Sequence, residues 1–466
     1  MPLLSVHTTE NPVAILTASG AVFTYSDLQH FTERFSKVIN KRTLLFILSE
    51  NTIGSVAGYS AALESKIVPL LLNAGTEKQL LNHLITTYQP EFIWLPEKQK
   101  EQFEYEIVFT SNDYVLVKTG YTTPQLHDEL ALLLPTSGST GSPKLVRHSY
   151  GNIIANAKNV SQVFEIQATD RAMAILPMHY TMGLSVITSY LYSGATVLLY
   201  DGSLTDPQFW KFIKDSKATS FTGVPFSFEI LAKLRFLRMD LPDLKIITQG
   251  GGKLSDALFV DFAEQAAKSN KKFIATYGQT EGTARMAYLA PEFALTKVGS
   301  IGKAIPNGKL YLRDEAGEVI TTPNTKGEMI YEGPNVTLGY ATQLEDLTRG
   351  DERHGVLPTG DIAIQDADGF FYIVGRISRF LKLYGLRVSL DETEKMIREA
   401  FQVEVMCLGT DEKMKIVVTR NDIAEELLSF LVKKTGIHHQ AFEVHFRTEL
   451  PRNETGKLLY KLDENA

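Results

Sequence analysis

A chain of 466 residues predicts more than one domain, and its 44% hydrophobic and 22% charged residues are typical of a globular protein. The single cysteine, Cys407, excludes intrachain disulfides and a cysteine metal cluster, and its apolar neighbours predict a core position. A formal net charge of −7 gives no electrostatic case for a nucleic-acid partner.

We expect neither a signal peptide nor stable membrane insertion. Residues 1–12 lack a basic segment followed by an apolar run. The most apolar long window, 183–200, is interrupted by serines and threonines, which favours a buried helix leading into a strand. A cytoplasmic enzyme fits these features, and a soluble binding protein fits the composition equally well.

Helices and strands alternate through the first hundred residues. A helix opens within 23–28, with Ser26 as the expected N-cap. Further segments are predicted as strands at 44–48, 67–71 and 91–95, and as helices at 55–63 and 77–87. This alternation indicates α/β layers with parallel strands.

A loop of hydroxyls and glycines follows a predicted buried strand at 130–134. Its candidate phosphate-binding residues are Thr136, Ser137, Gly138, Ser139, Thr140, Gly141 and Lys144. Glycines let backbone N–H groups approach an anion, hydroxyls donate hydrogen bonds and the lysine adds charge, so the loop suits a polyphosphate.

Two other interpretations of this loop are weaker. A flexible linker does not usually follow a leucine strand directly, with helix-like spacing next at 149–164. The P-loop of nucleotide hydrolases needs Gly-Lys-Ser/Thr, whereas Pro143 precedes Lys144 here.

The next segments predict a pocket. A strand at 174–177 leads into a loop with His179 and Gly183, and Ser185 follows. A histidine among methionine and tyrosine is more often a packed or pocket-lining residue than a catalytic base.

Two strands, at 244–249 and 272–277, each end in a glycine-containing segment. The first leads into a turn that includes Gly251 and Gly252, before a predicted helix at 255–269. The second leads into Tyr-Gly-Gln-Thr-Glu at 277–281.

This second motif offers three side chains suited to a nucleotide. Tyr277 presents an aromatic face for stacking. The Thr280 hydroxyl can donate to a phosphate oxygen, and the Glu281 carboxylate is a candidate ligand for Mg²⁺, which takes oxygen ligands and bridges to phosphates. Further on, Asp361 of the Thr-Gly-Asp at 359–361 offers two acceptor oxygens, although an Asp in a turn is common in general. The intervening segment 327–340 is predicted as β-structure without a chemical role.

The last part of the chain predicts a small α+β region. An amphipathic helix at 391–401 should turn Thr393, Met396, Ile397 and Ala400 inward, and a second helix spans 423–435. Before them stands a cluster of basic residues, Arg376, Arg379, Lys382 and Arg387, which suits a solvated face or contact with phosphates or an acidic partner.

Taken in order, these motifs resemble those of the adenylate-forming enzymes, which include acyl-CoA synthetases, adenylation domains of peptide synthetases and luciferases. Segment 136–146 is similar to the family's TSGTTGxPKxV, 277–281 to YGxTE and 359–361 to TGD. Segment 450–457, which ends in Lys457, is similar to LPRxxxGK. The resemblance extends over essentially the whole chain.

The resemblance implies an α/β fold, with a large N-terminal domain of layered α/β subdomains and a small mobile α+β C-terminal domain. The implied boundaries are 1–375 for the AMP-binding domain, 376–379 for the hinge and 380–466 for the mobile domain. The pivot falls on Ser378 and Arg379, where the family usually has Asp in place of Ser378. Pivoting needs permissive dihedral angles rather than a carboxylate.

The resemblance also implies site roles. Gly251 and Gly252 would lie against the adenine, Thr280 would bond the α-phosphate, and Asp361 would accept from the ribose hydroxyls. Arg376 would contact the ribose or a phosphate, and the acyl pocket would be lined by His179, Gly183 and Ser185. Lys457, on the mobile domain, would enter the active site as the catalytic lysine beside Thr280 and Glu281. Relatives that activate α-amino acids place an Asp on this pocket segment to pair with the substrate ammonium, but 177–200 contains no Asp or Glu. A buried ammonium without a partner is costly, so the sequence favours an acid without an α-amino group.

The implied chemistry uses ATP and Mg²⁺ in two half-reactions: a carboxylic acid becomes an acyl-adenylate with release of pyrophosphate, and a thiol then takes the acyl group as a thioester. Coenzyme A is the favoured acceptor, which makes the chain an acid–CoA ligase. A ligase that loads a separate phosphopantetheinyl carrier protein, of the D-alanine or biosynthetic type, is the alternative. A non-catalytic nucleotide-binding protein would lack Glu281 or Lys457, and both are present.

Overall fold

The computed structural model describes residues 11–122, 125–135, 144–377, 379–383, 386–410, 412–453 and 456–460. The chain divides into two compact units. The larger consists of Met1–Lys309 with Tyr331–Leu357, and the smaller of Leu310–Ile330 with Pro358–Ala466.

One sheet of the larger unit has the strand order β20-β9-β8-β4-β3-β5-β7-β6. Its strands are β3 (Leu44–Ser49), β4 (Val68–Asn73), β5 (Phe92–Pro96), β6 (Glu106–Ser111), β7 (Tyr114–Lys118), β8 (Leu130–Pro135), β9 (Leu145–Ser149) and β20 (Gly339–Ala341). The central pairs are parallel and the outer ones antiparallel. Every residue of β3 is buried, as expected for a parallel strand covered on both faces.

The other sheet of this unit has the order β16-β15-β14-β13-β12-β10-β11-β1-β2. Its strands are β1 (Val13–Thr17), β2 (Val22–Thr24), β10 (Arg171–Ala174), β11 (Thr196–Leu199), β12 (Ser220–Gly223), β13 (Ile246–Gln249), β14 (Lys272–Tyr277), β15 (Ala287–Leu289) and β16 (Lys303–Ala304). Five neighbouring pairs of this sheet are parallel: β1–β11, β11–β10, β10–β12, β12–β13 and β13–β14.

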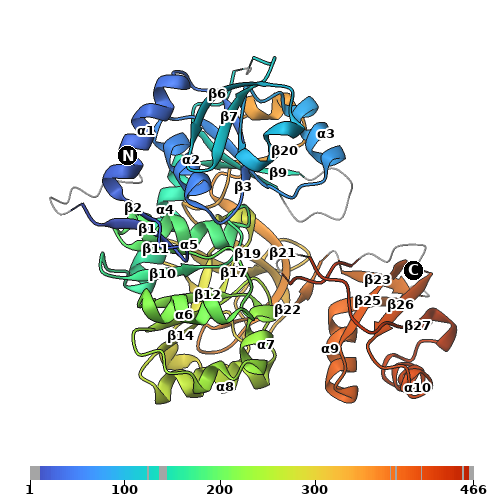
Figure 1. The fold of residues 1–466 in the computed structure, drawn as a ribbon. Helices are drawn as coiled ribbons and strands as arrows, with labels where there is room; N and C mark the ends of the chain where they lie inside the picture. The colour runs from blue at the N-terminus through green and yellow to red at the C-terminus, as the bar shows by residue number, and fades with distance from the viewer. Residues whose placement is uncertain are drawn as a thin grey trace. The chain divides into compact units, whose positions relative to one another are not determined.

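Helices cover both sheets (Figure 1). They are α1 (Tyr25–Val38), α2 (Ile53–Glu64), α3 (Lys78–Tyr88), α4 (Tyr150–Phe164), α5 (Thr181–Tyr192), α6 (Pro207–Asp215), α7 (Pro225–Lys233) and α8 (Asp256–Lys268). Apolar residues of α1, α2, α4 and α5 share one core with strands of both sheets, so these helices form the layer between them. Helix α5 is buried from Thr181 to Leu191, which accounts for its apolar composition on all sides.

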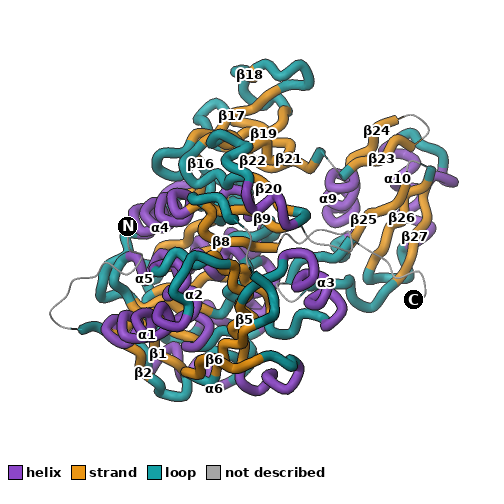
Figure 2. The backbone as a smooth tube through the Cα atoms, turned by 90° about the horizontal axis from the view of Figure 1, so that it is seen from above, coloured by secondary structure: helices purple, strands orange, loops and turns teal. Residues whose placement is uncertain are grey.

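The smaller unit contains most of a sheet with the order β18-β17-β19-β21-β22, together with the two C-terminal sheets β23-β24 and β25-β26-β27. The strands are β17 (Lys309–Arg313), β18 (Val319–Ile320), β19 (Gly327–Glu332), β21 (Val356–Gln365), β22 (Phe371–Arg376), β23 (Phe380–Leu383), β24 (Leu386–Ser389), β25 (Val405–Thr410), β26 (Lys413–Val418) and β27 (Phe442–Phe446). Helices α9 (Leu390–Phe401) and α10 (Ala424–Thr435) pack on the last of these sheets around a shared core (Figure 2). Cys407 lies fully buried in that core, as predicted.

The predicted α/β class, with parallel strands and a smaller α+β C-terminal part, is confirmed. The domain boundaries predicted at 375 and 380 and the mobility of the C-terminal domain stay predictions. Of the helices in the described residues, none is long and apolar enough to cross a lipid bilayer.

Some local predictions were wrong. Helix α1 is capped by Thr24 in a capping box with Asp27, not by Ser26. The strand predicted at 174–177 is β10 at Arg171–Ala174, because the chain turns before Pro177. Helix α9 buries Thr393 and Ile397 as predicted but exposes Ala400 and is only partly covered at Met396, since its inner face includes the buried Glu394.

Candidate active site

The candidate phosphate loop connects two neighbouring strands. Strands β8 and β9 are antiparallel, and Leu134 pairs with Val146 and Pro135 with Leu145. The predicted residues Thr136, Ser137, Gly138, Ser139, Thr140 and Gly141 lie outside the described residues. Lys144 is exposed, with its ammonium 5.5 Å from the ring centroid of Tyr340.

Several predicted residues meet at one edge of a sheet. Strands β10, β12, β13 and β14 run parallel, so the segments that follow them leave the sheet at its carboxyl edge. These segments are 175–180, the glycine turn with Gly251 and Gly252, and the motif that begins at Tyr277. Ligands of open α/β sheets bind at this edge.

Hydrogen bonds join neighbouring segments along this edge. Thr276 donates its hydroxyl to the carbonyl of Gln249 at 3.1 Å, and the Gln249 amide donates to the carbonyl of Gly252 at 2.7 Å. The Gln279 amide donates to the Tyr277 hydroxyl at 3.2 Å. The glycine turn and the tyrosine are therefore fixed relative to each other.

The motif after β14 bends sharply to present its threonine and glutamate. A side chain at Gly278 would place its Cβ 1.4 Å from the carbonyl oxygen of Ala284, so only glycine permits this bend. Thr280 and Glu281 follow in a short 3₁₀ turn. Thr181 donates to the Thr280 oxygen at 3.1 Å, which leaves the Thr280 hydroxyl proton to donate to an acceptor.

Glu281 is held by a residue to which the sequence assigned no chemistry. The Tyr340 hydroxyl donates to Glu281 Oε1 at 2.7 Å, and the guanidinium carbon of Arg353 lies 4.6 Å from the Tyr340 ring centroid. Burial, and then the charge of Glu281, raise the pKa of Tyr340 to about 12, so its proton stays in place at neutral pH. The tyrosine orients the carboxylate, and no hydrogen bond from the described residues occupies its second oxygen, which is therefore open to a cation.

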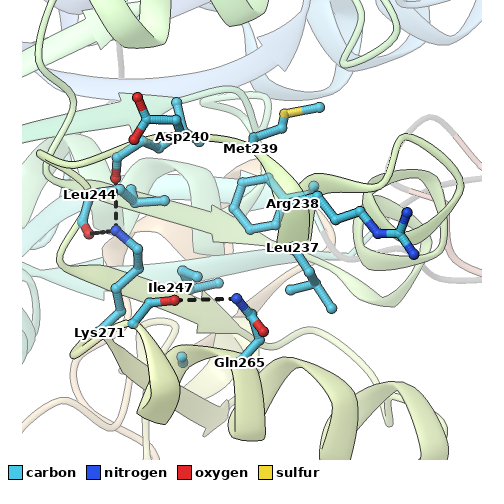
Figure 3. A pocket seen from close by; sticks show the side chains of 12 residues that line it. Leu237, Arg238, Met239, Asp240, Leu244, Ile247, Gln265 and Lys271 are labelled. Atoms are coloured by element: carbon cyan, nitrogen blue, oxygen red, sulfur yellow. Dashed lines mark hydrogen bonds between the residues drawn. The ribbon is translucent and has the colours of Figure 1, made fainter.

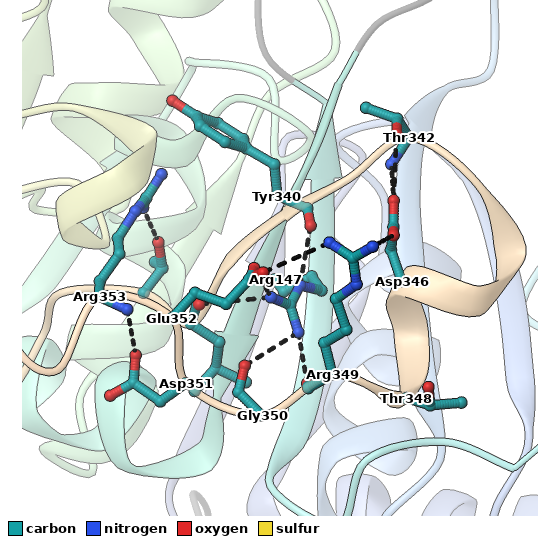
Figure 4. A network of polar contacts seen from close by, with 12 residues as sticks. Arg147, Tyr340, Thr342, Asp346, Thr348, Arg349, Gly350, Asp351, Glu352 and Arg353 are labelled. Atoms are coloured by element: carbon teal, nitrogen blue, oxygen red, sulfur yellow. Dashed lines mark hydrogen bonds and ion pairs between the residues drawn. The ribbon is translucent and has the colours of Figure 1, made fainter.

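A buried arginine fixes the strand that carries Tyr340 (Figure 4). Arg147 donates to the carbonyls of Tyr340 at 3.0 Å and Gly350 at 3.2 Å, and it pairs with Glu352. Burial lowers the pKa of Arg147, and its many acceptors balance that cost. A local pattern in the sequence gives no sign of this network, because its members are about 200 residues apart.

The predicted acyl-pocket residues lie around the start of α5. His179 is partly buried, and burial lowers its pKa to about 4, so it is neutral at neutral pH. A Cβ at Gly183 would lie 2.4 Å from the carbonyl of Pro177, so the glycine allows α5 to pack against the preceding loop. Ser185 lines a narrow cavity together with Thr181 and Asn156.

Other predicted residues lie in the smaller unit. Asp361 is 1% exposed and faces Arg376 across the β21–β22 pair, with a 2.9 Å ion pair between them. Both predicted ribose contacts are therefore adjacent. Lys457 is exposed, and its backbone N–H donates to the Asn453 side chain at 2.9 Å.

Of the two predicted pivot residues, Ser378 lies outside the described residues and Arg379 lies within them. The Arg379 guanidinium pairs with Asp391 and with Glu394 at 2.7 Å, and donates to the Cys407 carbonyl at 2.9 Å. The basic cluster predicted from the sequence is thus partly neutralised, since Arg376 also pairs with Asp361.

A separate pocket between the end of α7 and α8 contains none of the motif residues (Figure 3). The partly buried amine of Lys271 lies in this pocket and donates to the carbonyls of Leu241 and Leu244 at 2.7 Å each. Gln265 likewise bonds to Ser269 on its own helix. These groups stabilise the backbone around the pocket and give it no catalytic arrangement.

Comparison with known proteins matches residues 5–341 to the model of the AMP-binding enzyme family. The chain belongs to the AMP-binding enzyme family. This AMP-binding enzyme is 32% identical over 345 residues to a 2-succinylbenzoate–CoA ligase of Bacillus cereus, covering 71% of this chain and 69% of that protein. A 2-succinylbenzoate–CoA ligase of Bacillus mycoides is 31% identical over 349 residues with the same coverage.

Solved structures share the fold. The O-succinylbenzoate coenzyme A synthetase of Bacillus subtilis in complex with AMP has a TM-score of 0.79 at 24% identity, covering 99% of this chain and 96% of that one. ATP-bound MatB of Rhodopseudomonas palustris has a TM-score of 0.78 at 21% identity, with 98% and 96% covered. The predicted enzyme class is confirmed: this AMP-binding enzyme is an AMP-forming acid–thiol ligase.

Proposed function

We propose that this AMP-binding enzyme activates a small carboxylic acid with ATP and transfers the acyl group to coenzyme A. The observation that carries the proposal is the placement of Thr280 and Glu281 at the carboxyl edge, with Thr280 bonded to the cavity residue Thr181. A phosphate held by Thr280 would therefore lie beside an acid held in the cavity.

In the first half-reaction, a carboxylate oxygen forms a bond to the α-phosphorus of ATP and the bond to pyrophosphate breaks. The substrate carboxylate is already ionised, so no general base is needed, in agreement with a neutral, partly buried His179. The Thr280 hydroxyl donates to the α-phosphate. Lys144 and the loop 136–141 bind the leaving pyrophosphate, and Lys457 stabilises charge on the carboxylate and phosphate oxygens.

The site fits a magnesium ion. Mg²⁺ binds proteins through one or two carboxylates and completes its shell with water and phosphate oxygens. Glu281 supplies one such carboxylate, and Tyr340 bonds only one of its oxygens in the described part of the chain. When bound, the ion neutralises charge on the phosphates. Gly251, Gly252 and Tyr277 then hold the adenine, while Asp361 and Arg376 hold the ribose.

In the second half-reaction, the thiol attacks the acyl carbon, and AMP leaves. A rotation of the domain 380–466 about Ser378 and Arg379 would replace Lys457 by the thiol. The CoA-ligase names of the similar Bacillus proteins support coenzyme A as the acceptor over a carrier protein. Activity in the cytoplasm, where ATP and coenzyme A are available, belongs to the same proposal.

Pyrophosphate release from ATP tests the function directly. A panel of carboxylic acids, beginning with 2-succinylbenzoate, is assayed with coenzyme A, with a phosphopantetheinylated carrier protein, and with neither. We expect acid-dependent pyrophosphate release in all three and an acyl-CoA product in the first. Release that supports only the carrier thioester would establish the alternative, and no release with any acid would contradict the proposal.

Lys457→Ala should slow adenylation by about 10²–10³-fold, comparable to the loss of one preorganised donor. Thioester formation from supplied acyl-adenylate should be largely unchanged, because the lysine serves only the first step. Lys433→Ala, an exposed lysine on α10 of the same unit, is the matched control. Equal losses in both half-reactions would show that the lysine has another role.

A further inference from the structure

An arginine outside the predicted motifs lies beside Glu281. The guanidinium carbon of Arg353 is 4.6 Å from the ring centroid of Tyr340, whose hydroxyl donates to the Glu281 side chain. Arg353 Nη1 donates to the Glu281 carbonyl at 3.4 Å and to the Thr337 hydroxyl. Thr337 is fully buried and donates its hydroxyl to the same carbonyl at 3.0 Å. One end of the guanidinium is therefore anchored to the backbone of the motif that carries Thr280 and Glu281.

The positive charge of Arg353 has no carboxylate partner among the described residues. Asp351 accepts from the backbone N–H groups of Arg353 and of the residue after it, at 2.9 and 3.0 Å. Glu352 pairs with Arg147, and the Glu281 side chain accepts from the tyrosine hydroxyl. Within the described part of the chain, the acceptors near the guanidinium are neutral hydroxyl and carbonyl oxygens. Because Arg353 is only partly buried, its charge is available to an anionic ligand.

A second cation approaches the ring of Tyr340. The ammonium of Lys144 lies 5.5 Å from the ring centroid, and both side chains are exposed to a ligand. Strand β20 pairs antiparallel with β9 and sets Tyr340 opposite Val146, two residues after Lys144. Cation–π contacts compensate only weakly for the repulsion between two positive charges. Phosphate oxygens would satisfy both cations through charge-assisted hydrogen bonds.

The chemistry of the first half-reaction puts the leaving group on this side of the site. Displacement at a phosphorus atom is in line, so pyrophosphate leaves on the side away from the attacking carboxylate. The cavity residue Thr181 bonds to Thr280, whereas Tyr340 bonds to Glu281. With the acid on the Thr181 side, the β- and γ-phosphates lie on the Tyr340 side, next to the two cations.

We propose that Arg353 binds the β- and γ-phosphates of ATP and the leaving pyrophosphate, and that the Tyr340 ring holds its guanidinium in position. The inference rests on the proposed function and adds a residue to its nucleotide site. Nη1 makes the anchoring bonds, and the rest of the planar guanidinium faces the phosphates. A guanidinium suits this task because its fork of donors matches two phosphate oxygens at once.

Arg353→Gln tests the inference by removing the charge while keeping an amide donor for the anchoring bonds. Titration calorimetry with ATP, AMP and inorganic pyrophosphate at constant ionic strength is the measurement. The Kd values of ATP and pyrophosphate should rise about 10–100-fold, as expected for the loss of hydrogen bonds to a charged group. The Kd of AMP should stay unchanged, because AMP lacks the β- and γ-phosphates.

Two further variants calibrate this result. Arg353→Lys keeps the charge but loses the planar fork, so its Kd for ATP should lie between those of the wild type and Arg353→Gln. Arg34→Gln is the matched control, because Arg34 is exposed on α1 with its guanidinium carbon 5.1 Å from the ring centroid of Phe109. It should change none of the three Kd values.

Removal of Mg²⁺ separates direct binding from an effect through Glu281. The titrations are repeated in EDTA, where Glu281→Gln should no longer weaken ATP binding, since the carboxylate then has no cation to hold. The weaker ATP binding of Arg353→Gln should persist, because ATP without metal still presents its phosphates. A loss that disappears in EDTA would show that Arg353 acts only by positioning Glu281, and would overturn the inference.

Chemical modification of the wild-type enzyme gives a test that needs no variant, and it decides if Arg353→Gln does not fold. Phenylglyoxal modifies accessible arginines, and mass spectrometry measures the rate at Arg353. Pyrophosphate or ATP at about ten times its Kd should slow this rate about 10-fold, whereas AMP should leave it unchanged. Modification of Arg353 that pyrophosphate does not slow would contradict the inference.

The outcomes also distinguish the two proposals. Equal weakening of ATP and AMP binding in Arg353→Gln would assign the arginine a structural role, and the ligase function would stand. If the wild-type enzyme binds neither ATP nor AMP nor pyrophosphate, the ligase function falls and the inference falls with it.

Discussion

Two arginines, the largely buried Arg379 and the fully buried Arg285, have opposite environments. Arg379 pairs with Asp391 and Glu394, donates to the Cys407 carbonyl, and lies 3.7 Å from the ring centroid of Tyr460. Arg285 has one serine hydroxyl and two unpartnered nitrogens. The same residue type is therefore fully paired in one place, and in the other has two buried nitrogens without a partner among the described residues.

The comparison shows which buried charges belong to the fold. The carboxylates around Arg379 come from the helix that it anchors, α9, so folding itself completes the network. Around Arg285, the described residues supply the Ser185 hydroxyl and the face of Phe164. This difference between the two arginines predicts different changes in the free energy of unfolding when each is replaced, and these can be measured without the enzyme assay.

The largest effect is expected for Arg379→Met. Its removal leaves Glu394, which is buried and raised in pKa by desolvation, without its cation, and should lower the free energy of unfolding by about 3–5 kcal/mol. Urea unfolding measures the loss, and hydrogen exchange should place it in α9 and β25. Arg398→Met, exposed on the same helix, is the control and should change little. A loss below about 1 kcal/mol would show that the network contributes no more to the free energy of unfolding than a surface ion pair does.

His148 provides an intermediate case, because it is buried with one bonded nitrogen. Its pKa is about 3 when folded and near 6.5 when unfolded, so the unfolded chain binds the extra proton between these values. Stability is therefore full above pH 6.5 and falls with acid by about 1.4 kcal/mol per pH unit for this group.

His148→Gln should remove the contribution of His148 to the pH dependence of the free energy of unfolding between pH 6.5 and 5. Urea unfolding at each pH measures this dependence. The lowered pKa of His179 acts in the same direction and remains in the variant. His30→Gln, exposed on α1, is the matched control. An unchanged slope in His148→Gln would mean that the histidine charges without unfolding.

The smallest effect on stability is expected for Arg285→Met. Replacing an unpaired buried cation by an apolar side chain of similar length should leave the free energy of unfolding within about 1 kcal/mol of the wild type, or raise it. The contrast with Arg379→Met is measured under the same conditions. A loss of about 3–5 kcal/mol at Arg285 would place both arginines in the structural class.

The sequence predicted the parts of the molecule that are local. The strand before the candidate phosphate loop, the glycine turn after β13 and the bend at Gly278 are all marked by residues adjacent in the chain. The parallel order of strands then explains why separate motifs meet at one edge.

Contacts between distant segments were not predictable in this way. Tyr340 bonds Glu281, 59 residues away in the chain, and Arg147 bonds residues around 340–352. Arg285 follows a recognised motif by only a few residues, but its significance depends on which partners are missing. Similarly, the helical spacing predicts Ala400 on the inner face of α9. In the structure Ala400 is exposed, because the inner face includes Glu394, which bonds to Arg379.

Helix α5 is enclosed from Thr181 to Leu191. If the acid occupies the cavity at this helix, as proposed, that enclosure limits how the enzyme can change its range of acids. A larger side chain on any face of the helix must displace neighbours in a packed interior, at a cost of about 1–3 kcal/mol. Exchanges that shorten Thr181, Ser185 or Thr188, which line the cavity, create room without that cost in overpacking. Engineering toward bulkier acids should therefore proceed by trimming this helix.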